Sequence, residues 1–179
     1  VKMMREQIAV ADVLGAKIYR PAILPSAVMI QDENAFMQER IELIKEVLPD
    51  LRKYNIKLGM EIHAPMQPEL LLRLAKKVND KSFGLIPDFS VWATKQALDT
   101  HIIGKASLES VKAVMPYTIH VHAKAHMFNE KGEELTHPYK ELITILKESG
   151  YDGYISAEFE GWWEGEDYDS KRIAETHIN

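Results

Sequence analysis

Acidic residues and histidines stand where several short apolar runs of the sequence end. Glu61, Asp88 and Glu158 each close such a run, and His120 and His122 alternate with apolar residues in another. If the runs are parallel β-strands, these side chains lie at the carboxyl ends of the strands, where parallel α/β enzymes carry their chemistry. Several buried carboxylates and an imidazole would each be costly unless a cation compensated them. The pattern therefore predicts a site for a divalent metal ion.

The favoured ligands are the polar residues closest to the strand ends. Glu160 lies beyond the apolar run that Glu158 ends, so Glu160 is expected to be solvated, and His120 is a weaker candidate than His122. The favoured set is Glu61, Asp88, His122 and Glu158. Three carboxylates and one imidazole suit Mn²⁺ first, with Mg²⁺, Co²⁺ and Zn²⁺ as alternatives.

Structural roles compete with these functional ones. Asp88 is also the residue type that commonly begins or ends a turn. A histidine pair in a strand, seen alone, is more often structural than ligating. We expect His126 and His137 at the surface, in loop or helix-cap positions. Trp162 and the tryptophan after it either pack a loop or form a stacking wall for a sugar ring.

The elements that must position these residues follow from hydrophobic periodicity. Apolar segments rich in β-branched residues alternate with segments of helical spacing along the whole chain. Short, mostly buried strands are expected at 17–19, 57–62, 83–86, 118–123 and 153–158. Helices are expected around 41–51, with a kink or restart at Pro49, then at 69–78, at 107–114, between Pro138 and Gly150, and from Asp169 onward.

This alternation predicts an α/β fold built from repeated βα units. No linker or low-complexity tract divides the sequence, so residues 1–179 are expected to form a single domain. A closed (β/α)8 barrel has eight strands and typically about 250 residues, which exceeds what this chain offers. We therefore expect part of a TIM barrel, with units absent at both ends or completed by another chain.

Composition narrows the functional classes. The 27 acidic and 22 basic residues give a net charge of −5, which argues against nucleic-acid binding. The absence of cysteine removes disulfides and thiolate chemistry and is compatible with a cytoplasmic location. No apolar run reaches the roughly 20 residues of a membrane helix, so no membrane association is expected.

Five segments resemble the xylose isomerase-like TIM barrels, the family of sugar-phosphate isomerases and epimerases. The matching segments are 16–20, 59–63, 88–90, 120–124 and 153–158. The resemblance covers essentially the whole chain as the fourth to eighth strands, so the first three βα units and part of the last helix would be absent. It also implies that Glu61, Asp88, His122 and Glu158 are the metal ligands. This set coincides with the one reached from the residues.

The resemblance further implies a reaction. In the family's isomerases and epimerases, the metal polarises a ketone and its neighbouring hydroxyl and stabilises an enediolate. Two glutamates, here Glu61 and Glu158, move a proton to and from the adjacent carbon. His63 is expected as an additional acid or base. The residues expected to bind substrate are Arg20, Lys124, His120 and Trp162.

Two departures from the family pattern leave the activity open. Val91 stands where many members have a histidine, and Ala125 stands where an aspartate often follows the lysine. The main expectation is a metal-dependent sugar isomerase or epimerase that acts on a small carbohydrate. The alternatives are a lyase such as a C-glycoside deglycosidase α-type subunit, and a non-catalytic barrel subunit. A homo-oligomer or hetero-oligomer is expected in each case.

Overall fold

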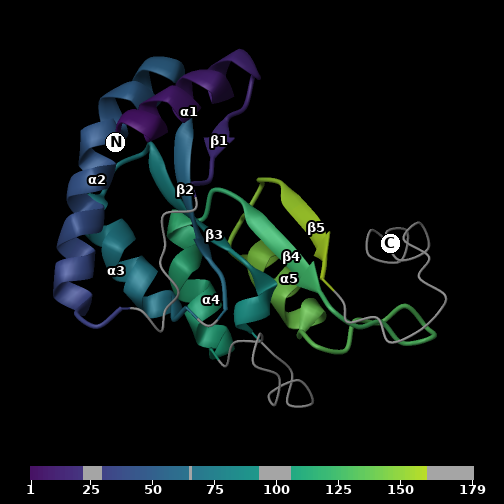
Figure 1. Cartoon of the computed structure of the whole chain (residues 1–179). Coiled ribbons are helices and arrows are strands. Elements are labelled where there is room, and N and C mark those ends of the chain that lie inside the picture. The colour runs from purple at the N-terminus through teal and green to yellow at the C-terminus, as the bar shows by residue number, and fades with distance from the viewer. Residues whose placement is uncertain (22–29, 65, 93–105, 161–179) are drawn as a thin grey trace.

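The computed structural model of the protein describes residues 1–21, 30–64, 66–92 and 106–160, in which helices alternate with parallel strands (Figure 1). The strands are β1 (Ile18–Tyr19), β2 (Lys57–Ile62), β3 (Phe83–Pro87), β4 (Val121–Ala125) and β5 (Ile155–Phe159). The helices are α1 (Lys2–Val13), α2 (Glu33–Tyr54), α3 (Pro68–Val78), α4 (Leu108–Val114) and α5 (Tyr139–Glu148), with short 3-10 helices η2 (Phe89–Val91) and η4 (Met115–Tyr117). The helix expected from Asp169 lies outside the described residues.

The strands follow one another in chain order. β1, β2 and β3 form one parallel sheet, and β4 and β5 form a second parallel pair. Two isolated parallel bridges, Leu85 with Thr118 and Asp88 with His122, connect β3 to the segment that contains β4. Because all the strands are parallel, their carboxyl ends lie along one rim, where the candidate site residues are found.

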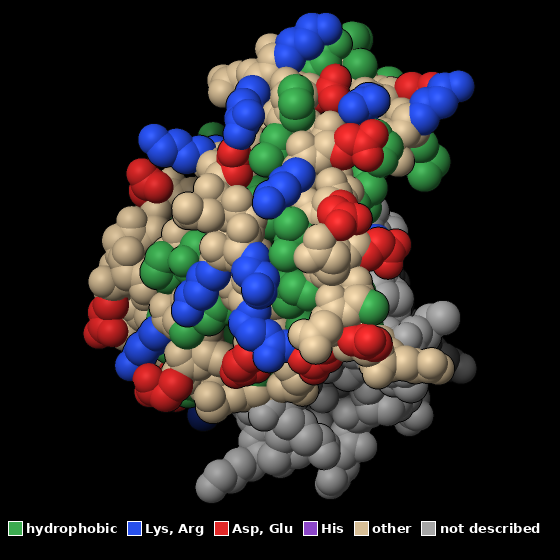
Figure 2. Space-filling model, turned by 90° about the vertical axis from the view of Figure 1, so that its left-hand side faces the viewer, with side chains coloured by type: hydrophobic (Ala, Val, Ile, Leu, Met, Phe, Trp, Pro, Cys, Tyr) green, Lys and Arg blue, Asp and Glu red, His purple; other side chains and the backbone are tan. Residues whose placement is uncertain are grey.

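The helices cover one side of the strands (Figure 1). Each helix packs against the next one in the chain, from α1 to α5. This packing buries the apolar face of each amphipathic helix. In α3, for example, Leu71, Leu74 and Val78 are buried on one face, and Lys76 and Lys77 are exposed on the other. On the face shown in Figure 2, basic and acidic side chains are interspersed rather than separated into patches. Among the described residues, no helix has both the length and the hydropathy needed to cross a bilayer.

Helix α2 is longer and more regular than its sequence predicts. The carboxylate of Asp32 accepts hydrogen bonds from two main-chain N–H groups of the first turn, and Asn55 ends the helix with a φ of 52°. The helix continues through Pro49, so the expected restart does not occur. A proline removes one backbone hydrogen bond, but Leu48 and Leu51 are buried on either side of it. Burial of these side chains holds the helix together across the proline.

Strand β5 departs from the expectation that every strand is mostly buried. Tyr154, just before β5, is 85% exposed, and Ile155 is 43% exposed. β5 is the last described strand, and β4 is its one described neighbour. The sequence shows that these side chains are apolar. Whether they are buried depends on which segments pack against β5, and the sequence pattern does not show that.

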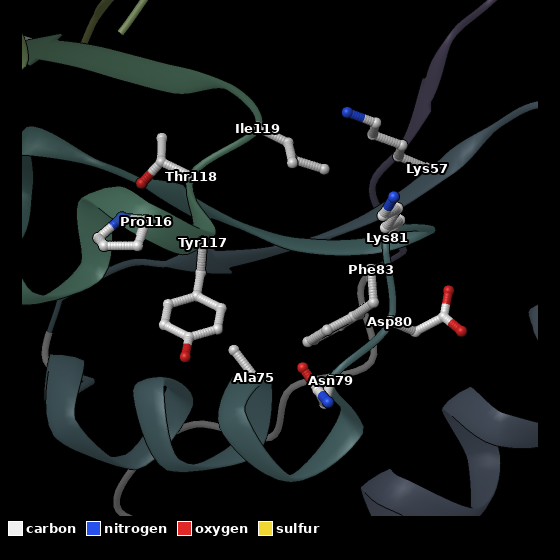
Figure 3. A pocket seen from close by; sticks show the side chains of 10 residues that line it. All are labelled: Lys57, Ala75, Asn79, Asp80, Lys81, Phe83, Pro116, Tyr117, Thr118 and Ile119. Carbon is white, nitrogen blue, oxygen red and sulfur yellow. The ribbon is translucent and has the colours of Figure 1, made fainter. Parts of the chain in front are cut away.

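A pocket of about 600 Å³ lies at the opposite end of the strands, where they begin (Figure 3). Lys57, Phe83 and Tyr117 are among the residues that line it. Close packing here needs a glycine: a Cβ at Gly84 would lie 2.9 Å from the main-chain oxygen of Tyr117. In parallel α/β barrels this end serves stability and the other end carries the chemistry.

Candidate metal centre

Four side chains from neighbouring strands meet at the carboxyl-end rim. They are Glu61 of β2, Asp88 directly after β3, His122 of β4 and Glu158 of β5. Each offers one potential ligand atom, and these four atoms lie within 4.8 Å of one another. Nδ1 of His122 is 2.5 Å from Oε1 of Glu61 and 3.8 Å from Oε2 of Glu158. The structure therefore brings together the four residues that the strand ends singled out.

Asp88 supplies a buried oxygen that faces this group. Its Oδ1 accepts a hydrogen bond of 2.7 Å from the main-chain N–H of Ser90, which fixes the carboxylate at the start of η2. Its Oδ2 has no hydrogen-bond partner among the described residues, although Nζ of Lys124 lies 3.6 Å away. Burial raises the pKa of Asp88, against the opposing effects of Lys124 and Ser90. A buried carboxylate oxygen that accepts no hydrogen bond is suited to coordinate a cation.

Glu61 is held from two sides. Oε2 pairs with Nη1 of Arg20 at 3.0 Å, while Oε1 faces His122. Burial alone would raise the pKa of Glu61, but the His122 contact and the Arg20 charge outweigh it and lower that pKa. Glu61 is therefore an oriented carboxylate that is ionised at neutral pH.

Lys124 is buried among carboxylates. Its side chain is 1% exposed, and Nζ lies 2.9 Å from both Glu158 and Glu160 and 3.6 Å from Asp88. Burial alone would lower the pKa of Lys124, but the three carboxylates raise it. Glu160 is exposed, as expected, and it also pairs with this ammonium. The β4–β5 register explains the pairing, because Lys124 is directly opposite Glu158, two residues before Glu160.

His120 lies beside the candidate ligands. Its ring centroid is 5.4 Å from that of His122, and Nε2 lies 2.8 Å from Oγ of Ser156 on β5. Burial and the neighbouring His122 lower the pKa of His120. These residues and Arg20 border a pocket of about 570 Å³. The pocket places predicted substrate-binding residues around one space next to the candidate ligands.

His63 follows β2, two residues after Glu61. Its Nδ1 lies 2.7 Å from the main-chain oxygen of Ala64. A carbonyl oxygen only accepts, so Nδ1 carries the proton of this bond. Trp162, the remaining predicted substrate contact, lies outside the described residues.

His126 and His137 were expected at the surface, and this expectation is wrong. They are 4% and 2% exposed, and Nδ1 of His126 lies 2.9 Å from Nε2 of His137. The loop that follows β4 folds back so that His137 contacts the main-chain oxygen of Trp92 at 3.0 Å. The one sequence signal for this cluster was that four histidines fall between positions 120 and 137.

Comparison with protein families identifies the family to which the chain belongs. The family described as Xylose isomerase-like TIM barrel matches residues 1–176. The chain belongs to this family. The expected fold class is thereby confirmed, with the described strands forming part of the barrel.

Curated relatives of this xylose isomerase-like protein include deglycosidase subunits. The 3'-dehydrocarminate deglycosidase alpha subunit of Microbacterium sp. is 25% identical, over 76% of this chain and 59% of the relative. The C-glycoside deglycosidase alpha subunit of Arthrobacter globiformis is 43% identical over 63 residues, which are 35% of this chain and 17% of the relative. The chain thus spans less than two thirds of the length of either relative.

Solved structures share the fold. An IOLI protein with a bound zinc atom superposes with a TM-score of 0.66 at 16% identity, covering 88% of this chain and 59% of that one. A D-psicose 3-epimerase from Clostridium cellulolyticum has a TM-score of 0.69 at 12% identity, covering 92% of this chain and 57% of that one. The chain therefore shares with these structures the barrel fold expected from its sequence.

Proposed function

We propose that this chain provides the divalent-metal site of a carbohydrate-processing enzyme that moves a proton next to a carbonyl, as sugar isomerases and epimerases do. The observation that carries the proposal is the convergence of Glu61, Asp88, His122 and Glu158 within 4.8 Å at one rim. Oδ2 of Asp88, which is buried and accepts no hydrogen bond from the described residues, supports a cation at their centre. The family membership and the sugar epimerase among the structural neighbours agree with this chemistry.

The same four residues would hold the ion. An oxygen-rich set with one nitrogen suits Mn²⁺, and Mg²⁺, Co²⁺ and Zn²⁺ are alternatives. The structure with a zinc atom among the neighbours supports a divalent ion without choosing between metals. When bound, such an ion would act as a Lewis acid on a carbonyl and an adjacent hydroxyl of the substrate.

Glu61 and Glu158 are the proposed proton carriers. Glu61 is oriented by Arg20 at 3.0 Å and is ionised, so it can accept a proton. Glu158 comes from β5, whereas Glu61 comes from β2, and the Glu158 side chain is 39% exposed, so a substrate can reach it. Each carboxylate must come within hydrogen-bond reach of the carbon-bound proton, on opposite sides for an epimerase.

The surrounding polar residues have separable proposed roles. Arg20 and His120 border the pocket and are the proposed contacts for substrate oxygens. His63 is the proposed additional acid or base, and Trp162 remains a predicted sugar contact. Lys124 is proposed to balance the charge of the carboxylates, because its buried ammonium is better placed for that than for touching a sugar.

Further βα units are proposed to complete the barrel. Tyr154 and Ile155 expose apolar surface at β5, while β1 is the other edge strand of the described part. We propose that three preceding units, or an equivalent part of another chain, cover this surface. The relatives named as alpha subunits favour a hetero-oligomer as the working form.

A second candidate function is cleavage of a keto-sugar glycoside. The observation that favours it is that the two curated relatives described above are deglycosidase alpha subunits. The metal site and the two glutamates would serve here as well, because removal of a proton beside a carbonyl also begins an elimination. The two functions differ in whether an aglycone leaves.

Hydrogen exchange tests the proposal. The purified protein with Mn²⁺ is incubated in D₂O with candidate ketoses and oxidised C-glycosides, and NMR follows both exchange beside the carbonyl and aglycone release. Exchange should occur, and Glu61→Gln and Glu158→Gln should abolish it. The matched control is Glu109→Gln on α4, whose side chain is 81% exposed. Exchange that survives both glutamate substitutions would contradict the proposal, and aglycone release would select the lyase.

A further inference from the structure

A second group of potential metal ligands lies in the loop between β4 and α5. It consists of His126, Glu134 and His137, whose ligand atoms lie within 4.8 Å of one another. The group shares no residue with the four-residue centre and is formed within one loop. Both imidazoles are buried, at 4% and 2% exposure. Buried imidazoles that face each other need an explanation, because each carries a lone pair or a proton that must be satisfied.

The orientation of His137 directs a lone pair into the group. Its Nδ1 lies 3.0 Å from the main-chain oxygen of Trp92, and since that oxygen only accepts, Nδ1 carries the proton. In the neutral ring Nε2 is then unprotonated, and it faces Nδ1 of His126 at 2.9 Å. A carbonyl that fixes the far nitrogen of a histidine is the usual outer contact of a metal-ligating imidazole.

The spacing of the two nitrogens is close to that of ligands on one ion. Nitrogens that bind Zn²⁺ tetrahedrally at about 2.0–2.1 Å lie roughly 3.3 Å apart. The observed separation is 2.9 Å, with a single proton between the rings. Replacing that proton by a cation requires the rings to separate by a few tenths of an ångström. The ring planes are tilted by 54°, so the rings are not stacked flat against each other.

Glu134 supplies the third donor from a rigid position. Oε2 accepts from the main-chain N–H groups of Thr136 at 2.7 Å and His137 at 2.6 Å, and Oε1 accepts from that of His126 at 3.1 Å. These bonds fix the carboxylate beside the imidazoles. The hydroxyl of Thr136 also donates to Oε1. Oε1 also accepts a longer hydrogen bond, of 3.3 Å, from the main-chain N–H of Met127. An ion would take the place of the Thr136 hydroxyl, which can rotate away, beside this carboxylate.

We propose that His126, Glu134 and His137 form a second site for a divalent transition metal of the zinc class, separate from the four-residue centre. Two imidazoles and one carboxylate make a three-ligand set that leaves a position open on the ion. The Trp92 contact and the ring-to-ring contact indicate two neutral rings, and a metal-binding imidazole is neutral. Burial, which lowers the pKa of both histidines, agrees with this. The ion would also tie the loop to η2, which follows the Asp88 ligand.

Cobalt stoichiometry tests this site. The protein is stripped of metal with a chelator and titrated with Co²⁺, and bound cobalt is measured by elemental analysis and visible absorption. The unmodified protein should bind two equivalents. Asp88→Asn should remove one and leave the other, which separates this site from the proposed function. His126→Gln and His137→Gln should each remove the second equivalent, while Glu133→Gln in the same loop should change nothing.

The outcomes are distinct even if a histidine variant does not fold. One equivalent in the unmodified protein, lost in Asp88→Asn, would overturn the second site and leave the first intact. One equivalent that Asp88→Asn retains and His137→Gln loses would support the second site while contradicting the first. Two equivalents in the unmodified protein and one in Asp88→Asn support the proposal without the histidine variants.

Discussion

Nδ1 of His122 lies 2.5 Å from Oε1 of Glu61, although the two residues are on different strands and 61 positions apart. The contact is made across β3, whose own carboxylate, Asp88, ends 4.0 Å from the same nitrogen. The register of β2 with β3 and of β4 with β5, together with the bridge between Asp88 and His122, places carboxylates from three strand ends around this histidine nitrogen. The same register fixes which donors a bound cation would meet.

Arg20 is expected to position Glu61 for metal binding. Arg20→Met removes the 3.0 Å ion pair to Oε2 and frees the carboxylate to rotate. We predict that the affinity for Mn²⁺ falls by about tenfold, the lower range for loss of an outer contact. Calorimetric titration measures it. Arg73→Met is the matched control, because Arg73 is similarly exposed, at 54% against 46%, and pairs with Glu33 on another helix.

Lys124→Met is expected to destabilise the protein strongly. The substitution keeps much of the volume but leaves Asp88, Glu158 and Glu160 without their shared cation. Breaking a buried ion pair by removing one partner costs about 3–5 kcal/mol, and the partial exposure of both glutamates should reduce the loss to about 2–4 kcal/mol. Urea unfolding measures this loss.

The exposed Lys112 on α4 provides the comparison for this variant. Lys112→Met should change the free energy of unfolding by less than about 1 kcal/mol. A Lys124→Met protein as stable as Lys112→Met would show that the ammonium does not compensate the carboxylates.

The stability of the metal-free protein should fall as the pH falls from 6.5 to 4. Burial, followed by the neighbouring His137, lowers the pKa of His126 from 6.5 to about 4. Between pH 6.5 and 4, His126 therefore binds a proton in the unfolded chain but not in the folded chain, so the free energy of unfolding rises with pH across this window. The loss from pH 7 to 4 amounts to at most about 3 kcal/mol from this residue.

Urea unfolding at both pH values checks this in His126→Gln. That variant should show a smaller difference between pH 7 and pH 4 than the unmodified protein, because it lacks one of the buried imidazoles. Glu133→Gln, in the same loop, should keep the full difference. Equal pH dependence in His126→Gln and the unmodified protein would show that His126 is not buried in its neutral form.

The sequence predicted the residues whose position depends on strand ends. Glu61, Asp88 and Glu158 each close an apolar run, and parallel strands bring such ends to one rim, so periodicity was enough to place them together. The sequence distinguished His122 from His120 as a metal ligand only weakly, because both residues alternate with apolar residues in the same run. The family resemblance pointed to the same four.

The remaining features depend on contacts between distant segments. Burial of His126 and His137 requires the loop after β4 to fold onto Trp92, and no local pattern encodes that contact. The pairing of Glu160 with Lys124 depends on the β4–β5 register. These are properties of packing, so they became visible only in three dimensions.

Anomalous diffraction from crystals grown with Mn²⁺ tests the central claim most directly. A manganese peak should lie about 2.0–2.4 Å from carboxylate oxygens of three acidic residues and from one imidazole nitrogen. Those residues are Glu61, Asp88, Glu158 and His122. A peak at this position that disappears in Asp88→Asn would be the predicted result. Crystals that bind manganese elsewhere, with these four side chains still paired only with one another and with Arg20 and Lys124, would contradict the account.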